Sequence, residues 1–112
     1  MDAFGDLESR GLVERPTVPT DCEHNAHLFY LKVKDLDTRT RLINHLKRSE
    51  IMAVFHYVPL HSAPAGKIFG RFHGTDRWTT VESERLVRLP LYYNVTEAER
   101  SMVVDAVLSF FS

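Results

Sequence analysis

Residues 51–61, Ile-Met-Ala-Val-Phe-His-Tyr-Val-Pro-Leu-His, stand near the middle of the chain and join an apolar run to a polar loop. The run from Ile51 to Phe55 is short and apolar, which predicts a buried strand. The residues after it place two histidines and a tyrosine where that strand gives way to a loop. Loops held by a rigid scaffold often carry functional side chains. His56, Tyr57 and His61 are therefore the candidate site residues.

This stretch does not contain a complete catalytic device. It has no nucleophile and base with an orienting partner, and no metal ligands at a recognised spacing. One alternative is a metal site built from His56, His61 and His73, but zinc needs three or four well-placed ligands. A second alternative is purely structural: His56 caps strand-end carbonyls, Tyr57 packs on the sheet and His61 is simply exposed.

The length and composition of the chain are those of one ordinary folded domain. The chain has 112 residues, of which 44% are apolar and 26% charged, and its formal net charge is −1. That balance gives no electrostatic basis for nucleic-acid binding. No apolar run approaches the ~20 residues that cross a bilayer, and the acidic start of the chain lacks the apolar core of a secretion signal. The single cysteine, Cys22, fits a reducing compartment, so we expect a cytoplasmic protein.

The first half of the chain predicts a helix end, a linker, a strand and a helix. Ala3 to Arg10 read as the last turns of a helix that ends at Gly11, and Pro16 and Pro19 make the following segment extended. Period-two alternation over 26–34 predicts a strand with Phe29, Leu31 and Val33 on its buried face. A helix then runs to about residue 50, with Asp37 as its N-cap and Leu42, Ile43 and Leu46 facing inward.

The second half predicts a loop with two further helices and a strand. Residues 62–75 are rich in glycine and proline, with one helical turn near Ile68 and Phe69. Thr79 or Thr80 caps a short helix that runs through Val87, with Val81 and Leu86 on its inner side. Residues 88–92 form a strand that Pro90 assigns to a sheet edge. Thr96 and Glu99 form a capping box for the last helix, whose apolar stripe is Met102, Val103, Ala106, Val107 and Phe110.

This order of elements predicts an α+β fold with a small, mostly antiparallel sheet and helices packed on one face. A free-standing, ferredoxin-like ligand-binding or regulatory domain is compatible with the same order, because a fold does not dictate a function.

Several short motifs resemble the C-terminal domain of the DegT/DnrJ/EryC1/StrS family, which comprises pyridoxal-phosphate-dependent aminotransferases that act on nucleotide-linked keto-sugars. The resemblance covers residues 25–111, in the family's own order of motifs. The motifs that show the resemblance are His27-Leu28-Phe29-Tyr30, His56-Tyr57-Val58-Pro59-Leu60-His61, Glu82 to Arg85, Leu89-Pro90-Leu91 and Thr96-Glu97-Ala98-Glu99. It implies a division into the end of a connecting helix and a linker over 1–24, and the C-terminal small domain of a fold-type I aminotransferase over 25–112.

The resemblance also implies a reaction and its partners. The stretch Asp21-Cys22-Glu23-His24-Asn25 is similar to that of members which move an amino group from glutamate to C4 of a dTDP-4-keto-6-deoxy-sugar, for cell-surface polysaccharide synthesis. In this family a large N-terminal domain binds the pyridoxal phosphate and carries the Schiff-base lysine, and the intact enzyme is a homodimer. None of Lys32, Lys34, Lys47 and Lys67 lies in that lysine motif. We therefore expect no catalytic, cofactor-binding or metal residue in these 112 residues, and no activity from them alone.

Within such an enzyme, His56, Tyr57 and His61 would line the mouth of the active site. Imidazole and phenol groups donate hydrogen bonds without a full charge, which suits a sugar or its diphosphate. Arg71, Arg77 and Trp78, in the loop region, are weaker candidates for contact with the nucleotide. The face that meets the large domain would be apolar, with Leu12, Val13, Tyr30 and Tyr92 as candidates.

Overall fold

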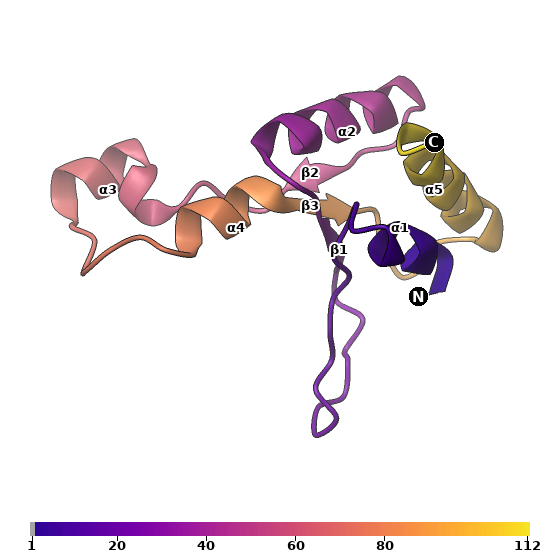
Figure 1. Ribbon diagram of the computed structural model, residues 1–112, viewed down its shortest axis with the longest axis horizontal. Helices are drawn as coiled ribbons and strands as arrows, with labels where there is room; N and C mark the ends of the chain where they lie inside the picture. The colour runs from indigo at the N-terminus through magenta and orange to yellow at the C-terminus, as the bar shows by residue number, and fades with distance from the viewer. Residues whose placement is uncertain (1) are drawn as a thin grey trace.

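A three-stranded antiparallel sheet stands at the centre of the computed structural model, which describes residues 2–112. The strands are β1 (Phe29–Lys32), β2 (Val54–Phe55) and β3 (Leu86–Leu89), in the spatial order β1-β3-β2. Figure 1 shows α1 (Gly5–Ser9), α2 (Leu36–Arg48) and α5 (Glu97–Phe110) gathered around the sheet, whereas α3 (Pro64–Phe69) lies far from it. The predicted fold class, α+β with a small antiparallel sheet and helices, is confirmed.

The register of β1 on β3 explains which face of the sheet is buried. Leu31 lies opposite Val87 and Phe29 opposite Leu89, so that all four side chains share one face. Leu31 and Val87 are fully buried, and Val33 continues the same face just beyond β1. The predicted inward set of this strand is therefore confirmed, although the strand itself is shorter than expected.

Helix α2 covers this core with Leu42 and Leu46, which are fully buried, while Ile43 is half-buried. The helix starts two residues earlier than predicted. Asp35, not Asp37, is the N-cap: its backbone is extended and its carboxylate accepts a hydrogen bond from the Thr38 amide at 2.9 Å. Asp37 lies in the first turn instead, where a negative charge is also favourable.

Helix α5 has the predicted start. The Thr96 hydroxyl accepts from the Glu99 amide, and the Glu99 carboxylate accepts from the Thr96 amide, which completes a capping box. Val107 is fully buried, but Met102 is 59% exposed, so its place in the predicted apolar stripe was wrong. Helix α5 packs on α2 and η1 with the face that contains Val107, and Met102 lies outside this contact face.

The first residues of the chain belong to the core. After η1 (Asp2–Phe4) and α1, Gly11 adopts φ +69°, the left-handed conformation predicted for the end of this helix. Phe4, Leu7 and Val13 are buried. The prediction that Val13 is part of an exposed apolar face was therefore wrong, and Leu12 and Tyr30 are only half-buried.

The strand expected over residues 51–55 is reduced to two residues. Val54 and Phe55 pair with β3, but they are 42% and 44% exposed, because β2 is an edge strand. Ile51 and Ala53 are buried ahead of the strand, and Met52 between them is 81% exposed. The prediction of a buried strand was thus correct for two core side chains and wrong for the strand's extent.

Beyond β2 the chain leaves the core as a distal lobe, defined here as residues 56–81. It contains η2 (Leu60–Ser62), α3 and the start of α4 (Thr79–Arg85), and Figure 1 shows these elements projecting to one side. Helix α4 ends at Arg85 and β3 begins at the next residue. Val81 is 51% exposed rather than inward, because α4 leads away from the core.

The position of β3 corrects a second prediction. The strand is central, with β1 and β2 on either side, whereas Pro90 predicted an edge. Pro90 follows the last strand residue, Leu89, so its missing N–H removes no bond from the ladder. Three strands are found in the described residues, one fewer than the ferredoxin-like arrangement contains. None of the helices in residues 2–112 has the length and apolar character to cross a bilayer.

Candidate functional site

His56 and Tyr57 extend from the end of β2 into solvent. Their rings meet edge to face, with centroids 4.5 Å apart and an interplanar angle of 66°. Tyr57 is 69% exposed, and within the described part of the chain the His56 ring makes no hydrogen bond. Their polar atoms are therefore free to bind a ligand, and Tyr57 does not pack on the sheet as the structural alternative required.

His61 is placed differently, because it belongs to a polar cluster. Its Nε2 lies 2.9 Å from Asp76 Oδ2 and 3.4 Å from Thr80 Oγ1. The Thr80 hydroxyl donates to Asp76 Oδ2, and the Thr80 amide donates to Asp76 Oδ1 at 3.3 Å. One face of the imidazole contacts the ring of Phe72, at a centroid distance of 4.5 Å. His61 thus connects η2, to which it belongs, with the loop before α4 and the first turn of that helix.

The hydrogen bond of Thr80 holds the pKa of the Asp76 carboxyl below its usual range, with His61 as a further cause. A carboxylate can only accept hydrogen bonds, so His61 Nε2 must carry the hydrogen between them. The ring nitrogen Nδ1 then has a free lone pair whenever the imidazole is neutral, since no described residue bonds to it.

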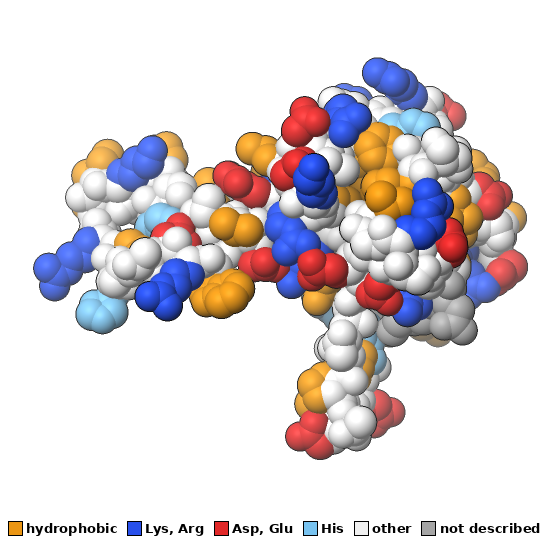
Figure 2. All heavy atoms as spheres, viewed as in Figure 1, with side chains coloured by type: hydrophobic (Ala, Val, Ile, Leu, Met, Phe, Trp, Pro, Cys, Tyr) orange, Lys and Arg blue, Asp and Glu red, His pale blue; other side chains and the backbone are white. Residues whose placement is uncertain are grey.

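The surface of the distal lobe is unusually apolar. Leu60, Phe69 and Trp78 are 85%, 87% and 73% exposed. Figure 2 shows apolar, basic and histidine side chains together over this part of the molecule. Arg71 and Arg77 are exposed on the same lobe. The exposed large apolar side chains of the lobe are Tyr57, Val58, Leu60, Ile68, Phe69, Phe72, Trp78 and Val81.

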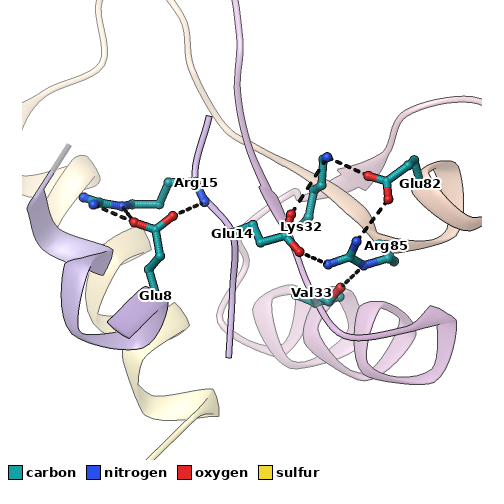
Figure 3. A network of polar contacts seen from close by, with 7 residues as sticks. All are labelled: Glu8, Glu14, Arg15, Lys32, Val33, Glu82 and Arg85. Carbon is teal, nitrogen blue, oxygen red and sulfur yellow. Dashed lines mark hydrogen bonds and ion pairs between the residues drawn. The ribbon is translucent and has the colours of Figure 1, made fainter. Parts of the chain in front are cut away.

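A network of charged side chains fixes α4 to β1 (Figure 3). Lys32 Nζ lies 2.6 Å from a carboxylate oxygen of Glu82, and Arg85 lies 3.1 Å from the other. Glu14 pairs with Arg85 from the segment that follows α1. The Nε of Arg85 also donates to the carbonyl of Val33 at 2.8 Å. Lys32 is therefore part of the connection between the sheet and the lobe.

The pKa values of this network shift in the directions that ion pairing favours. The hydrogen bond with Lys32 lowers the pKa of Glu82, and the same bond raises the pKa of Lys32. The bond with Glu14 raises the pKa of Arg85. All three groups are thus held in their charged forms, as structural ion pairs are.

None of the four lysines fits the role of a Schiff-base lysine. Such a lysine is activated by burial or by neighbouring cations, which lower its pKa. The pKa of Lys32 is shifted in the opposite direction, and Lys34, Lys47 and Lys67 are exposed. The described residues therefore offer no lysine to which an aldehyde cofactor would be joined.

The alternative of a metal site finds no support in the geometry. No three side chains of His, Cys, Asp or Glu come together in residues 2–112 in a way that would hold a metal ion. His73 is exposed in the loop, and Nε2 of His61 is already engaged with Asp76.

Asp76 and Thr80 are the site residues that the sequence analysis missed. Thr80 was expected to cap α4 through its own hydroxyl, whereas its amide and hydroxyl both bind Asp76. The available signal was an aspartate a few residues before a predicted helix start, a usual position for a capping side chain.

An apolar groove lies elsewhere on the molecule, and none of the predicted site residues line it. This groove, of about 560 Å³, runs between η1, the start of β1 and α5, and Phe4, Leu28, Leu91 and Val104 are among its lining residues. Its lining is mainly apolar. The distal lobe, not this groove, carries His56, Tyr57 and His61.

Comparison with known proteins finds curated relatives and several solved structures. An uncharacterized protein of Methanocaldococcus jannaschii is 33% identical over 116 aligned residues, which cover 99% of this chain and 29% of the relative. The chain therefore spans less than a third of the length of this relative.

This chain also covers less than a third of each solved structure. DesV of S. venezuelae, crystallised with a ketimine intermediate, superposes with a TM-score of 0.82 at 23% identity over 97% of this chain and 29% of its own. The sugar aminotransferase CalS13 of Micromonospora echinospora has a TM-score of 0.71 at 26% identity, over 96% and 28%. NtdA of Bacillus subtilis, solved with bound PMP, has a TM-score of 0.73 at 21% identity, over 96% and 25%.

The family model named DegT/DnrJ/EryC1/StrS aminotransferase family matches residues 2–108, nearly the whole chain. This agrees with the resemblance carried by the sequence motifs and with the fold of the solved neighbours. The chain belongs to the DegT/DnrJ/EryC1/StrS aminotransferase family.

Proposed function

We propose that this chain is the small C-terminal domain of a pyridoxal-phosphate-dependent sugar-nucleotide aminotransferase. The whole enzyme would transfer an amino group from glutamate to C4 of a dTDP-4-keto-6-deoxy-sugar, as a dTDP-4-amino-4,6-dideoxygalactose transaminase does. Its product would serve the synthesis of enterobacterial common antigen or lipopolysaccharide. The observation that carries the proposal is the family match over residues 2–108, together with a lobe that exposes His56 and Tyr57 to solvent and holds His61 in a half-buried polar cluster.

The cofactor would be bound outside this chain. The family and the PMP bound to NtdA support pyridoxal phosphate as the cofactor. The lysines described above do not fit that role, so the proposal assigns the cofactor and the Schiff-base lysine to a large N-terminal domain. The share of 29% that the chain covers in its relatives is consistent with such a domain.

In the whole enzyme, His56 and Tyr57 would contact the sugar or its diphosphate at the mouth of the site. Both rings are exposed, and the edge contact between them limits how either can turn. Arg71, Arg77 and Trp78 are exposed on the same lobe, and in the proposal they contact the nucleotide. A guanidinium binds phosphate oxygens in a bidentate manner, and an indole offers a stacking face to a base.

The exposed apolar side chains of the distal lobe support the proposed partner. Leu60, Ile68, Phe69 and Trp78 are each 73–87% exposed, and exposed apolar side chains that gather on one surface mark interaction sites. In the proposal the large domain covers part of this surface, and the whole enzyme is a homodimer. The exposed thiol of Cys22 fits the cytoplasm, the location that we propose.

The proposal is tested by assaying the chain alone and the whole protein that contains it. Both are given glutamate, pyridoxal phosphate and dTDP-4-keto-6-deoxyglucose, and the formation of 2-oxoglutarate and amino-sugar is followed. We expect no turnover from the chain alone and turnover from the whole protein. A 3-keto isomer of the sugar is the matched control for the position of amination.

Two substitutions refine the test. Tyr57→Phe removes one hydroxyl, and we expect it to raise the KM for the sugar by about 3–10-fold if that hydroxyl binds substrate. Tyr93→Phe, at a fully exposed tyrosine outside the distal lobe, is the control. Turnover by the isolated chain, or a whole protein that aminates no keto-sugar, would contradict the proposal.

A further inference from the structure

The cluster of His61, Asp76 and Thr80 joins two parts of the distal lobe that are distant in sequence. His61 lies in η2, Thr80 lies in the first turn of α4, and Asp76 lies in the loop just before that helix. The side chains of His61 and Asp76 are only 22% and 25% exposed, so both are partly withdrawn from water. A carboxylate in this position is satisfied by three hydrogen bonds, two from Thr80 and one from the imidazole.

The arrangement decides which ring nitrogen of His61 is left without a hydrogen-bond partner among the described residues. Asp76 Oδ2 accepts from Nε2 at 2.9 Å, which places the hydrogen on that nitrogen. The Phe72 ring, 4.5 Å from the imidazole centroid, restricts rotation of the ring about its side-chain torsions. With Nε2 engaged, Nδ1 is the nitrogen left to meet a ligand, and in the neutral ring it is an acceptor.

We propose that Asp76 is a positioning residue, which holds His61 in the Nε2–H tautomer so that Nδ1 accepts a hydrogen bond from a sugar hydroxyl. This inference rests on the proposed function only for the identity of the ligand. The contacts that fix the tautomer are present in the chain itself. Asp76 does not touch the substrate, and Thr80 acts one step further away by orienting the Asp76 carboxylate.

The supporting role of Thr80 follows from its two contacts. Its amide binds Oδ1 and its hydroxyl binds Oδ2, so the carboxylate plane is fixed on both oxygens. These bonds also hold the Asp76 carboxyl in its ionised form, because they lower its pKa. An ionised carboxylate cannot donate, and this keeps the hydrogen on His61 Nε2.

The tautomer is measured directly by two-bond ¹H–¹⁵N correlation spectra of the histidine rings in the 112-residue chain. The spectrum is recorded at pH 8, and His61→Gln identifies the resonance of His61 among the six histidines. We expect the Nε2–H tautomer in the unsubstituted chain. In Asp76→Asn the side-chain amide can donate to Nε2, so we expect the population to move to the Nδ1–H tautomer. Asp21→Asn, in the exposed linker, is the matched control.

A second pair of variants distinguishes a change of tautomer from a general loss of structure. Thr80→Ser keeps the hydroxyl and should leave the tautomer unchanged, whereas Thr80→Val removes it and should give a mixture of tautomers. An unchanged His61 spectrum in both Asp76→Asn and Thr80→Val would overturn the inference, even for an active aminotransferase.

The ligand part of the inference is tested by kinetics of the whole protein. Asp76→Asn should raise the KM for the keto-sugar about 3–10-fold, the effect of one lost hydrogen bond, with a smaller change in kcat. Unchanged KM in a variant whose tautomer has moved would overturn the contact with the sugar. A whole protein without transamination would end the proposed function, while the spectra would still decide whether Asp76 positions His61.

Discussion

The carbonyl oxygen of Leu60 lies only 1.6 Å from the place that a β-carbon would take on Gly66. Helix α3 therefore packs on η2 through bare backbone at this point, and no larger residue fits without moving one element. This contact determines how the two short helices of the distal lobe lie against each other, and so where His61 stands.

Gly66→Ala should displace α3 from η2. Overpacking of this kind costs about 1–3 kcal/mol, and here the neighbour is backbone, which gives less easily than a side chain. The measurement is amide hydrogen exchange of Lys67 and Gly70, whose amides bind the carbonyls of Ala63 and Gly66. Gly5→Ala is the control, because its β-carbon would meet only the end of Arg15 at 3.8 Å. Unchanged protection in Gly66→Ala would show that the close contact is not as described.

The ion pair of Lys32 and Glu82 should contribute to stability, because both side chains are about 70% withdrawn from solvent. A double-mutant cycle with Lys32→Met and Glu82→Gln is expected to give a coupling of about 0.5–1 kcal/mol. The matched control is Arg41 with Asp37, an exposed pair on α2, for which we expect almost no coupling. Equal coupling energies for the two pairs would count against a special role for the network.

The same pair predicts how stability changes with pH. The pKa of Glu82 is lowered, so its contribution is complete above the unfolded value of about 4.3 and is lost as the pH falls through the folded value. The pKa of Lys32 is raised, so its contribution is complete below about 10.4 and is lost as the pH rises through the folded value. Urea unfolding across this range should show both losses, and Lys32→Met should reduce each of them. A profile that Lys32→Met leaves unchanged would contradict the assignment.

The capping box of α5 should be measurable by a single substitution. Thr96→Ala removes the acceptor for the Glu99 amide, and the loss of such a cap costs about 1 kcal/mol. Thr96→Ser keeps the hydroxyl oxygen and should restore most of the free energy of unfolding. Thermal unfolding of the two variants provides the comparison, in which equal melting temperatures would argue against the cap.

The two apolar positions Leu46 and Met52 should respond in opposite ways. Leu46 is fully buried, so Leu46→Ala is expected to destabilise the fold by about 2–5 kcal/mol. Met52, in the run once expected to be a buried strand, is 81% exposed. Met52→Ala should change the free energy of unfolding by less than about 0.5 kcal/mol. Denaturant unfolding measures both, and a large effect at Met52 would mean that another surface covers it.

The elements predicted best are those whose signals are local. The capping box at Thr96 and the left-handed Gly11 depend on a few neighbouring residues, and both are confirmed. Asp35 and Asp37 offer nearly the same local signal, and in the structure it is Asp35 that accepts the hydrogen bond from the Thr38 amide. The central place of β3 depends on pairing with strands far along the chain, which Pro90 alone does not reveal.

For the candidate site, the sequence predicts where the residues lie along the chain but not which distant residues they contact. His56 and Tyr57 follow β2 in the sequence, so their position at the strand end was visible from the apolar run before them. The partner of His61 was not, because Asp76 is 15 residues away and reaches it only through the fold of the loop between them. Distant polar pairs of this kind have no periodicity to indicate them.

The direct passage from Arg85 in α4 to Leu86 in β3 has a mechanical consequence. No loop stands between the helix and the central strand, and the backbone of Arg85 is bonded to that of Val33 beside it. At this end the lobe is therefore joined to the sheet without a flexible connection. A displacement of the lobe, for example by a docked neighbour, would also displace β3.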